Sequence, residues 1–93
     1  EQREKFIRSR KQPLVEGKEP RDIAPVVAPT LLGKHATAAS LQRLIDSMTI
    51  LHKESYIKAI EAMTRYEPVA QLAAIRVPTL VIVGDEDTLT PPA

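Results

Sequence analysis

The chain of 93 residues contains no cysteine and only three glycines. Without cysteine it can form no disulfide, no thiolate zinc site and no cysteine nucleophile, and the default expectation is a cytoplasmic protein. The glycines are Gly17, Gly33 and Gly84. They lie too far apart for a phosphate-binding loop, a dinucleotide-binding fingerprint or a G-x-S-x-G nucleophile turn. The chemistries that depend on those motifs are therefore excluded within this chain.

An excess of positive charge, aromatic side chains and long apolar runs are also lacking. Thirteen basic residues against twelve acidic ones give a formal net charge of +1, and the aromatics are two tyrosines and one phenylalanine. A nucleic-acid binder would carry a basic surface with aromatic residues for base stacking. No apolar run approaches the ~20 residues that span a bilayer, and the charged N-terminus does not resemble a signal peptide. We expect neither nucleic acid nor a membrane among the partners.

The first 67 residues are dominated by helical patterns. Residues 1–11 lack glycine and proline and predict a mostly solvated helix, which ends before Pro13. The spacing of apolar residues after Asp22 predicts a short helix with Asp22 as its N-cap and Gly33 just past its end. Pro29 would lie in the interior of that helix, so we expect it to be kinked or broken there.

Two amphipathic stripes follow between Gly33 and Pro68. Thr37 is a suitable N-cap for the first helix, and the polar residues 52–55 separate it from the second. The stripes themselves consist of Leu41, Leu44, Ile45, Met48 and Leu51, then Tyr56, Ile57, Ile60 and Met63. These patterns predict two helices that each present one apolar face.

The pattern changes after residue 67. Pro68 is a suitable first residue for a short helix that carries Val69, Leu72 and Ile75. Residues 77–83 are then mostly apolar and β-branched, which is typical of a strand buried on both faces of a parallel sheet. The predicted fold class is therefore α/β, with a helical lid over residues 1–67 and one parallel core strand within residues 68–93. Because one strand cannot satisfy its own backbone groups, we interpret the chain as a piece of a larger protein.

Three consecutive acids follow this predicted strand, at the end where ligands and catalytic groups gather in open parallel sheets. A solvated turn is one interpretation of Asp85, Glu86 and Asp87. A magnesium-dependent D-x-D phosphatase motif fits poorly, because a glycine intervenes after the strand and a threonine comes one place early. A calcium-binding loop fails because Leu89 and Thr90 occupy positions of an oxygen ligand and of the turn glycine.

A third interpretation rests on the segment from Ile75 to Pro92, which reads I-R-V-P-T-L-V-I-V-G-D-E-D-T-L-T-P-P. It resembles the late-strand motif of α/β-hydrolase-fold enzymes, I-x-x-P-T-L-hydrophobic-x-x-G-x-x-D-x-x-x-P. The resemblance places the acid of a Ser-His-Asp triad at Asp87, where the carboxylate would accept the Nδ1–H of the catalytic histidine. Upstream, the 3-oxoadipate enol-lactonase subgroup has a lid segment E-x-Y-x-x-A-x-x-A, which is similar to the spacing of Glu54, Tyr56, Ala59 and Ala62.

The resemblance implies a hydrolase that cleaves an ester, lactone or related acyl bond, with this chain as its lid and acid. A small-molecule substrate and the remainder of the hydrolase core are the implied partners, and no cofactor is implied. The triad order Ser, Asp, His implies a nucleophile before Glu1 and a histidine after Ala93. His35 and His52 would then be surface or helix-end residues, and their surroundings lack the spacing of a metal site.

Tyr56, Met48 and Met63 are the candidate substrate-binding residues. The tyrosine hydroxyl needs a polar partner if it is buried, which makes it the preferred choice among the three. Packing within the lid is the alternative for each of them. The competing hypothesis for the whole chain is a non-catalytic, mostly helical interaction module, in which the acidic turn is merely solvated.

Overall fold

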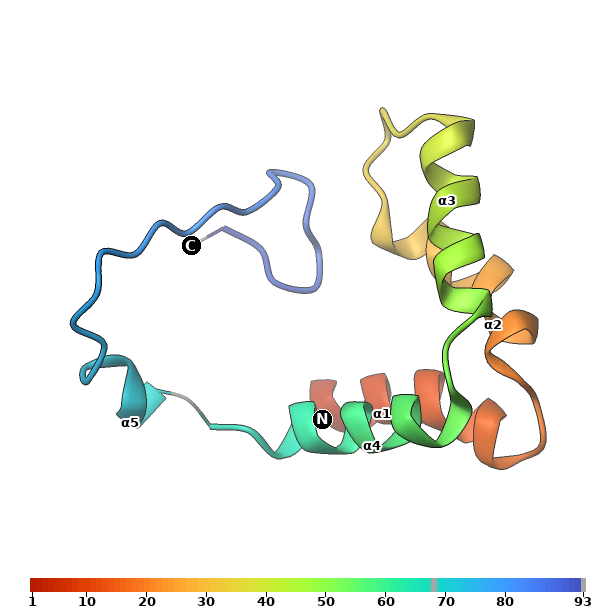
Figure 1. Cartoon of the computed structure of the whole chain (residues 1–93), viewed down its shortest axis with the longest axis horizontal. Helices are drawn as coiled ribbons and strands as arrows, with labels where there is room; N and C mark the ends of the chain where they lie inside the picture. Colours follow the sequence, from red (N-terminus) through yellow and green to blue (C-terminus); the bar gives the residue numbers. More distant parts are fainter. Residues whose placement is uncertain (68, 93) are drawn as a thin grey trace.

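The computed structural model describes residues 1–67 and 69–92. Figure 1 shows a helical body, in which α1 lies beside α4 and α2 beside α3, followed by an extended segment that runs back toward α3. In chain order the elements are α1 (Gln2–Val15), α2 (Pro20–Val27), the 3₁₀ helix η1 (Ala28–Leu31), α3 (Ala38–Thr49), α4 (Lys53–Arg65) and α5 (Val69–Leu72). The predicted helix start at Pro68, and with it the predicted domain boundary, falls on a residue outside this description. No helix within these two ranges is long and apolar enough to cross a membrane.

The first helix continues past its predicted end and includes Pro13 in its last turn. Proline there removes the hydrogen bond that a backbone N–H would donate to the carbonyl four residues earlier, so it opposes the continuation of the helix. Continuing the helix places Leu14 in the core, where it is completely buried. Gly17 then reverses the chain with a φ of +108°, a conformation that other residues rarely adopt. Tertiary burial of Leu14 therefore outweighs the signal of the proline.

The second helix begins at Pro20 rather than after Asp22, so the predicted N-cap is wrong. Pro20 needs no hydrogen-bond acceptor in the first turn and fits its first position. Asp22 is the third residue of the first turn, where its Oδ2 accepts the backbone N–H of the N-cap Glu19 at 2.8 Å. The predicted break near Pro29 is confirmed, since α2 ends at Val27 and a 3₁₀ turn follows.

The two amphipathic helices are confirmed as α3 and α4. Thr37 caps α3 as predicted, because its Oγ1 accepts the backbone N–H of Ser40 at 3.1 Å. At the start of α4, His52 Nδ1 accepts the backbone N–H of Ser55 at 3.4 Å. A side-chain acceptor at each N-terminus satisfies a donor that the helix itself leaves unpaired.

The core lies where the end of α1 meets α2, η1, α3 and the first half of α4. The partly buried side chains that pack against it come from both amphipathic stripes. Its fully or nearly buried members are Leu14, Ile23, Ala24, Val27, Ala28 and Met48. Both stripes therefore turn toward one core, which explains why α3 and α4 fold together with α2.

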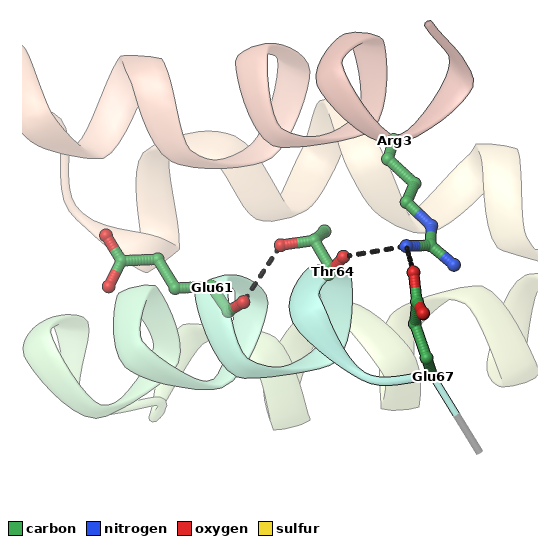
Figure 2. A network of polar contacts seen from close by, with 4 residues as sticks. All are labelled: Arg3, Glu61, Thr64 and Glu67. Carbon is green, nitrogen blue, oxygen red and sulfur yellow. Dashed lines mark hydrogen bonds and ion pairs between the residues drawn. The ribbon is translucent and has the colours of Figure 1, made fainter. Parts of the chain in front are cut away.

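The far ends of α1 and α4 are joined by polar contacts at the surface (Figure 2). Arg3 Nη1 donates to the Thr64 carbonyl at 3.4 Å and lies 3.6 Å from Glu67 Oε1. One turn before Thr64 in α4, Glu61 forms an ion pair with Lys11 of α1. Ion pairs at a surface add little net stability, so these contacts join the two helices without accounting for their packing.

The predicted α/β fold class is wrong: the folded part of the chain is all helical. Residues 77–83 are extended, but no strand and no sheet occur among residues 1–67 and 69–92. Leu80, Val81 and Ile82 are 83%, 82% and 85% exposed. A helix closes its hydrogen bonds within itself, whereas a strand forms only beside a partner. Within the described residues, the β-branched run therefore forms no ladder and is not buried.

Candidate functional site

The most organised part of the extended segment is the turn that carries Asp87. The backbone N–H of Asp87 donates to the Gly84 carbonyl at 3.1 Å, which closes the turn. Asp87 Oδ1 accepts the backbone N–H groups of Leu89 and Thr90, both at 2.9 Å. Oδ2 accepts the Thr90 hydroxyl at 2.8 Å. Three donors from the two residues just beyond therefore fix one carboxylate.

These donors favour the charged form of Asp87. The backbone N–H and the hydroxyl of Thr90, followed by the backbone N–H of Leu89, lower the pKa of Asp87 below its ordinary value. Partial desolvation opposes this effect without cancelling it. The carboxylate is thus ionised and oriented at neutral pH, which are the two properties that a triad acid needs.

A shallow hollow of about 400 Å³ adjoins this carboxylate. Apart from Asp87 its lining is mostly aliphatic and carries no second charged group. The lining residues are Val81, Ile82, Val83, Gly84, Asp87, Thr90, Pro91 and Pro92. An imidazole that reaches this open hollow would meet a single fixed carboxylate.

The turn contacts the helical body at the loop between η1 and α3. Glu86 Oε2 accepts the backbone N–H of Lys34 at 2.9 Å, and Glu86 Oε1 lies 3.4 Å from Lys34 Nζ. Figure 1 shows the turn facing this loop, with α4 on the far side of the molecule. The acid therefore approaches the start of α3 and not the helix that carries Tyr56 and Met63.

The three candidate substrate-binding residues have different surroundings. Met48 is buried in the core, and Tyr56 is half-buried and packs against the same core. Met63 is 60% exposed on α4. The turn that carries Asp87 meets the helical body at Lys34 and at none of these three residues, and their role in substrate binding stays a prediction.

The two histidines lie at separate places on the helical body. His52 caps α4 through Nδ1, which also lies 3.0 Å from Ser55 Oγ. His35 lies exposed in the loop before α3. Within residues 1–67 and 69–92 no three side chains of the ligand-forming types cluster in a way that could hold a metal ion.

The sequence points to Asp87 but not to Gly33, Lys34 and Glu86, which place its turn. The motif around Asp87 assigns no role to Glu86 or to Asp85, so nothing local marks Glu86 as the residue that makes a contact. Its partner is 52 residues away in the chain, and a single sequence contains no signal for a contact of that range. Gly33 was interpreted only as a helix end.

Comparisons of this chain with protein-family models, with curated proteins and with solved structures returned no match.

Proposed function

We propose that this chain supplies a helical lid and the acid Asp87 to a hydrolase that cleaves an ester, lactone or related acyl bond through a Ser-His-Asp triad. The observation that carries the proposal is the Asp87 carboxylate, which three hydrogen bonds fix beside a shallow, open hollow. The segment around it also resembles the acid-bearing motif of α/β-hydrolases. A small-molecule substrate and a cytoplasmic location are part of the same proposal.

The hydrogen-bond pattern leaves the Asp87 carboxylate able to accept one more hydrogen bond, from a catalytic histidine. A carboxylate has about four acceptor positions, and three of them are occupied by Leu89 and Thr90. The free position on Oδ2 can accept the Nδ1–H of an imidazole. The acid would then hold the tautomer of the histidine and stabilise the imidazolium as the nucleophile loses its proton, without itself becoming protonated.

The remaining members of the triad would come from outside residues 1–93. His52 is unsuitable because Nδ1 already accepts the helix cap of α4, and His35 lies in the loop before α3. The serines of the chain lie in α1, α3 and α4, away from any strand-to-helix turn that could expose a nucleophile.

The test is Asp87→Asn in the full protein, assayed with an activated ester. Asparagine keeps an acceptor for the turn but cannot hold the histidine in the reactive tautomer, so kcat should fall by up to ~10⁴ with unchanged helical content. Asp85→Asn is the matched control, because it removes a neighbouring carboxylate from the same turn. Equal turnover in the two variants would place the acid elsewhere.

The second candidate is a non-catalytic helical interaction module, and the structure offers one observation in its favour. The helices from α1 to α4 build a core of their own around Leu14 and Met48. On this hypothesis the full protein hydrolyses no activated ester, and Asp87→Asn changes no activity. Hydrolysis by the full protein that is lost in Asp87→Asn would argue against the module.

A further inference from the structure

Glu86 is the residue through which the acid turn contacts the rest of the molecule. Its two carboxylate oxygens bind the same residue, one at the backbone N–H of Lys34 and the other at the Lys34 ammonium group. A hydrogen bond from an uncharged amide to a carboxylate is stronger than one between neutral groups. The ammonium group is 74% exposed, so the backbone hydrogen bond is the more important of the two contacts.

The Glu86 carboxylate lies against the backbone of Gly33 in the helical body. A Cβ atom placed on Gly33 would overlap Oε2 of Glu86, whereas one placed on Gly84 would meet nothing within 4 Å. Gly33 does not adopt the left-handed conformation, so its backbone would accept alanine. The missing side chain at Gly33 is therefore what lets Glu86 reach the amide of Lys34.

This contact is also isolated. Among residues 1–67 and 69–92, the hydrogen bonds and ion pairs that join residues 77–92 to the helical body all involve Glu86. The hydrogen bonds of Asp87, Leu89 and Thr90 stay within the turn. The internal geometry of the turn is thus set locally, while its placement relative to the helices depends on Glu86.

We propose that Glu86 is a positioning residue that docks the acid turn on the Gly33–Lys34 loop and thereby holds Asp87 in a fixed direction relative to the lid. Glu86 and Asp87 are adjacent in the turn that the Gly84 carbonyl closes, so docking one side chain orients the other. A small misplacement of a catalytic group can cost about 10²-fold in rate. The role in catalysis rests on the proposed function, whereas the docking contact does not.

The docking contact is tested by the amide proton resonance of Lys34 in the full protein at neutral pH. A carboxylate acceptor shifts this resonance downfield, and Glu86→Ala should return it upfield. Gly33→Ala should do the same without removing a charge, because the new methyl group displaces Glu86. Glu86→Gln keeps an acceptor and should change the resonance less than either. The matched controls Gly84→Ala and Asp85→Asn should leave the Lys34 amide shift unchanged. An unchanged Lys34 amide shift in Glu86→Ala would show that the docking contact does not form.

The positioning role is tested by hydrolysis of an activated ester. Glu86→Ala and Gly33→Ala should each lower kcat by up to ~10²-fold, with KM changed less, and Glu86→Gln should recover much of the loss. Asp85→Asn should retain the normal rate. Unchanged kcat in Glu86→Ala, where Asp87→Asn abolishes turnover, would overturn positioning alone. Unchanged kcat in Asp87→Asn would overturn both the proposed function and the positioning role of Glu86. The Lys34 amide shift would still show whether the docking contact forms.

Discussion

The helical body from α1 to α4 and the extended segment over residues 77–92 are both rich in aliphatic residues, yet they bury them to opposite extents. Leu14 is completely buried, whereas Leu80 is 83% exposed. The helices complete their own hydrogen bonds and need only bring their apolar faces together. Residues 77–83 of the extended segment need a neighbouring strand to pair their backbone groups, and no strand occurs among residues 1–67 and 69–92. Apolar content therefore predicts burial only where secondary structure can form locally.

A matched pair of leucine substitutions should produce the largest difference between the two regions. Leu14→Ala removes a fully buried side chain and should lower the free energy of unfolding by about 2–5 kcal/mol. Leu80→Ala removes an exposed side chain and should change it by less than about 0.5 kcal/mol. Urea unfolding followed by the helical circular dichroism signal measures both. Equal losses in the two variants would mean that Leu80 is buried in solution.

A matched pair of threonine substitutions should separate the regions by a smaller amount. Thr37 Oγ1 satisfies the backbone N–H of Ser40 at the start of α3, so Thr37→Ala should cost about 1 kcal/mol in the same unfolding experiment. Thr79 Oγ1 donates to the Val77 carbonyl at 3.0 Å within the extended segment. Thr79→Ala should therefore leave unfolding unchanged, and a comparable cost would show that this segment belongs to the cooperative unit.

The smallest expected effect is a change in the pKa of one carboxyl group in each region, Glu61 in the helical body and Asp87 in the acid turn. The hydrogen bond and the charge of Lys11 lower the pKa of Glu61 in the body, while backbone and hydroxyl donors of Thr90 lower that of Asp87 in the turn. A lowered pKa means that each contact stabilises the folded state above the ordinary pKa and stops doing so as the pH falls through the lowered one.

Carboxyl carbon shifts followed against pH measure both groups. Lys11→Ala should raise the pKa of Glu61 toward its ordinary value and leave that of Asp87 unchanged. Thr90→Val should raise the pKa of Asp87 and leave that of Glu61 unchanged, since it removes the hydroxyl donor. A shift of both carboxyls in either variant would contradict the local origin of the two effects.

The helical half of the fold was accessible from the sequence because its signals are local. The stripes of α3 and α4, the Thr37 cap and the break at Pro29 all act within a few residues. The end of α1 could not be predicted because the burial of Leu14 depends on contacts with other helices. The start of α2 could not be predicted because Pro20 as first residue and Asp22 as N-cap are both acceptable helix starts.

The candidate site was predictable only at Asp87, through a resemblance in the motif around it. The loop at Gly33 and Lys34, on which the acid turn docks, could not be predicted. Lys34 and Glu86 are 52 residues apart in the chain, and no local sequence pattern indicates a contact over that separation. The predicted strand failed for a related reason. Residues 77–83 have the composition of a buried strand, but a strand forms only beside a second segment, and none pairs with residues 77–83 among residues 1–67 and 69–92.

Amide hydrogen exchange, measured residue by residue in the chain of 93 residues, tests the central claim most directly. The claim is a folded helical body followed by a segment, residues 77–92, whose backbone N–H groups are hydrogen-bonded only at the acid turn. It predicts slow exchange around the buried residues of α2, α3 and α4, near-random exchange across residues 79–83, and measurable protection at Lys34, Leu89 and Thr90. Protection across residues 79–83 as strong as that of α3 would contradict it, because only a paired strand could produce that result.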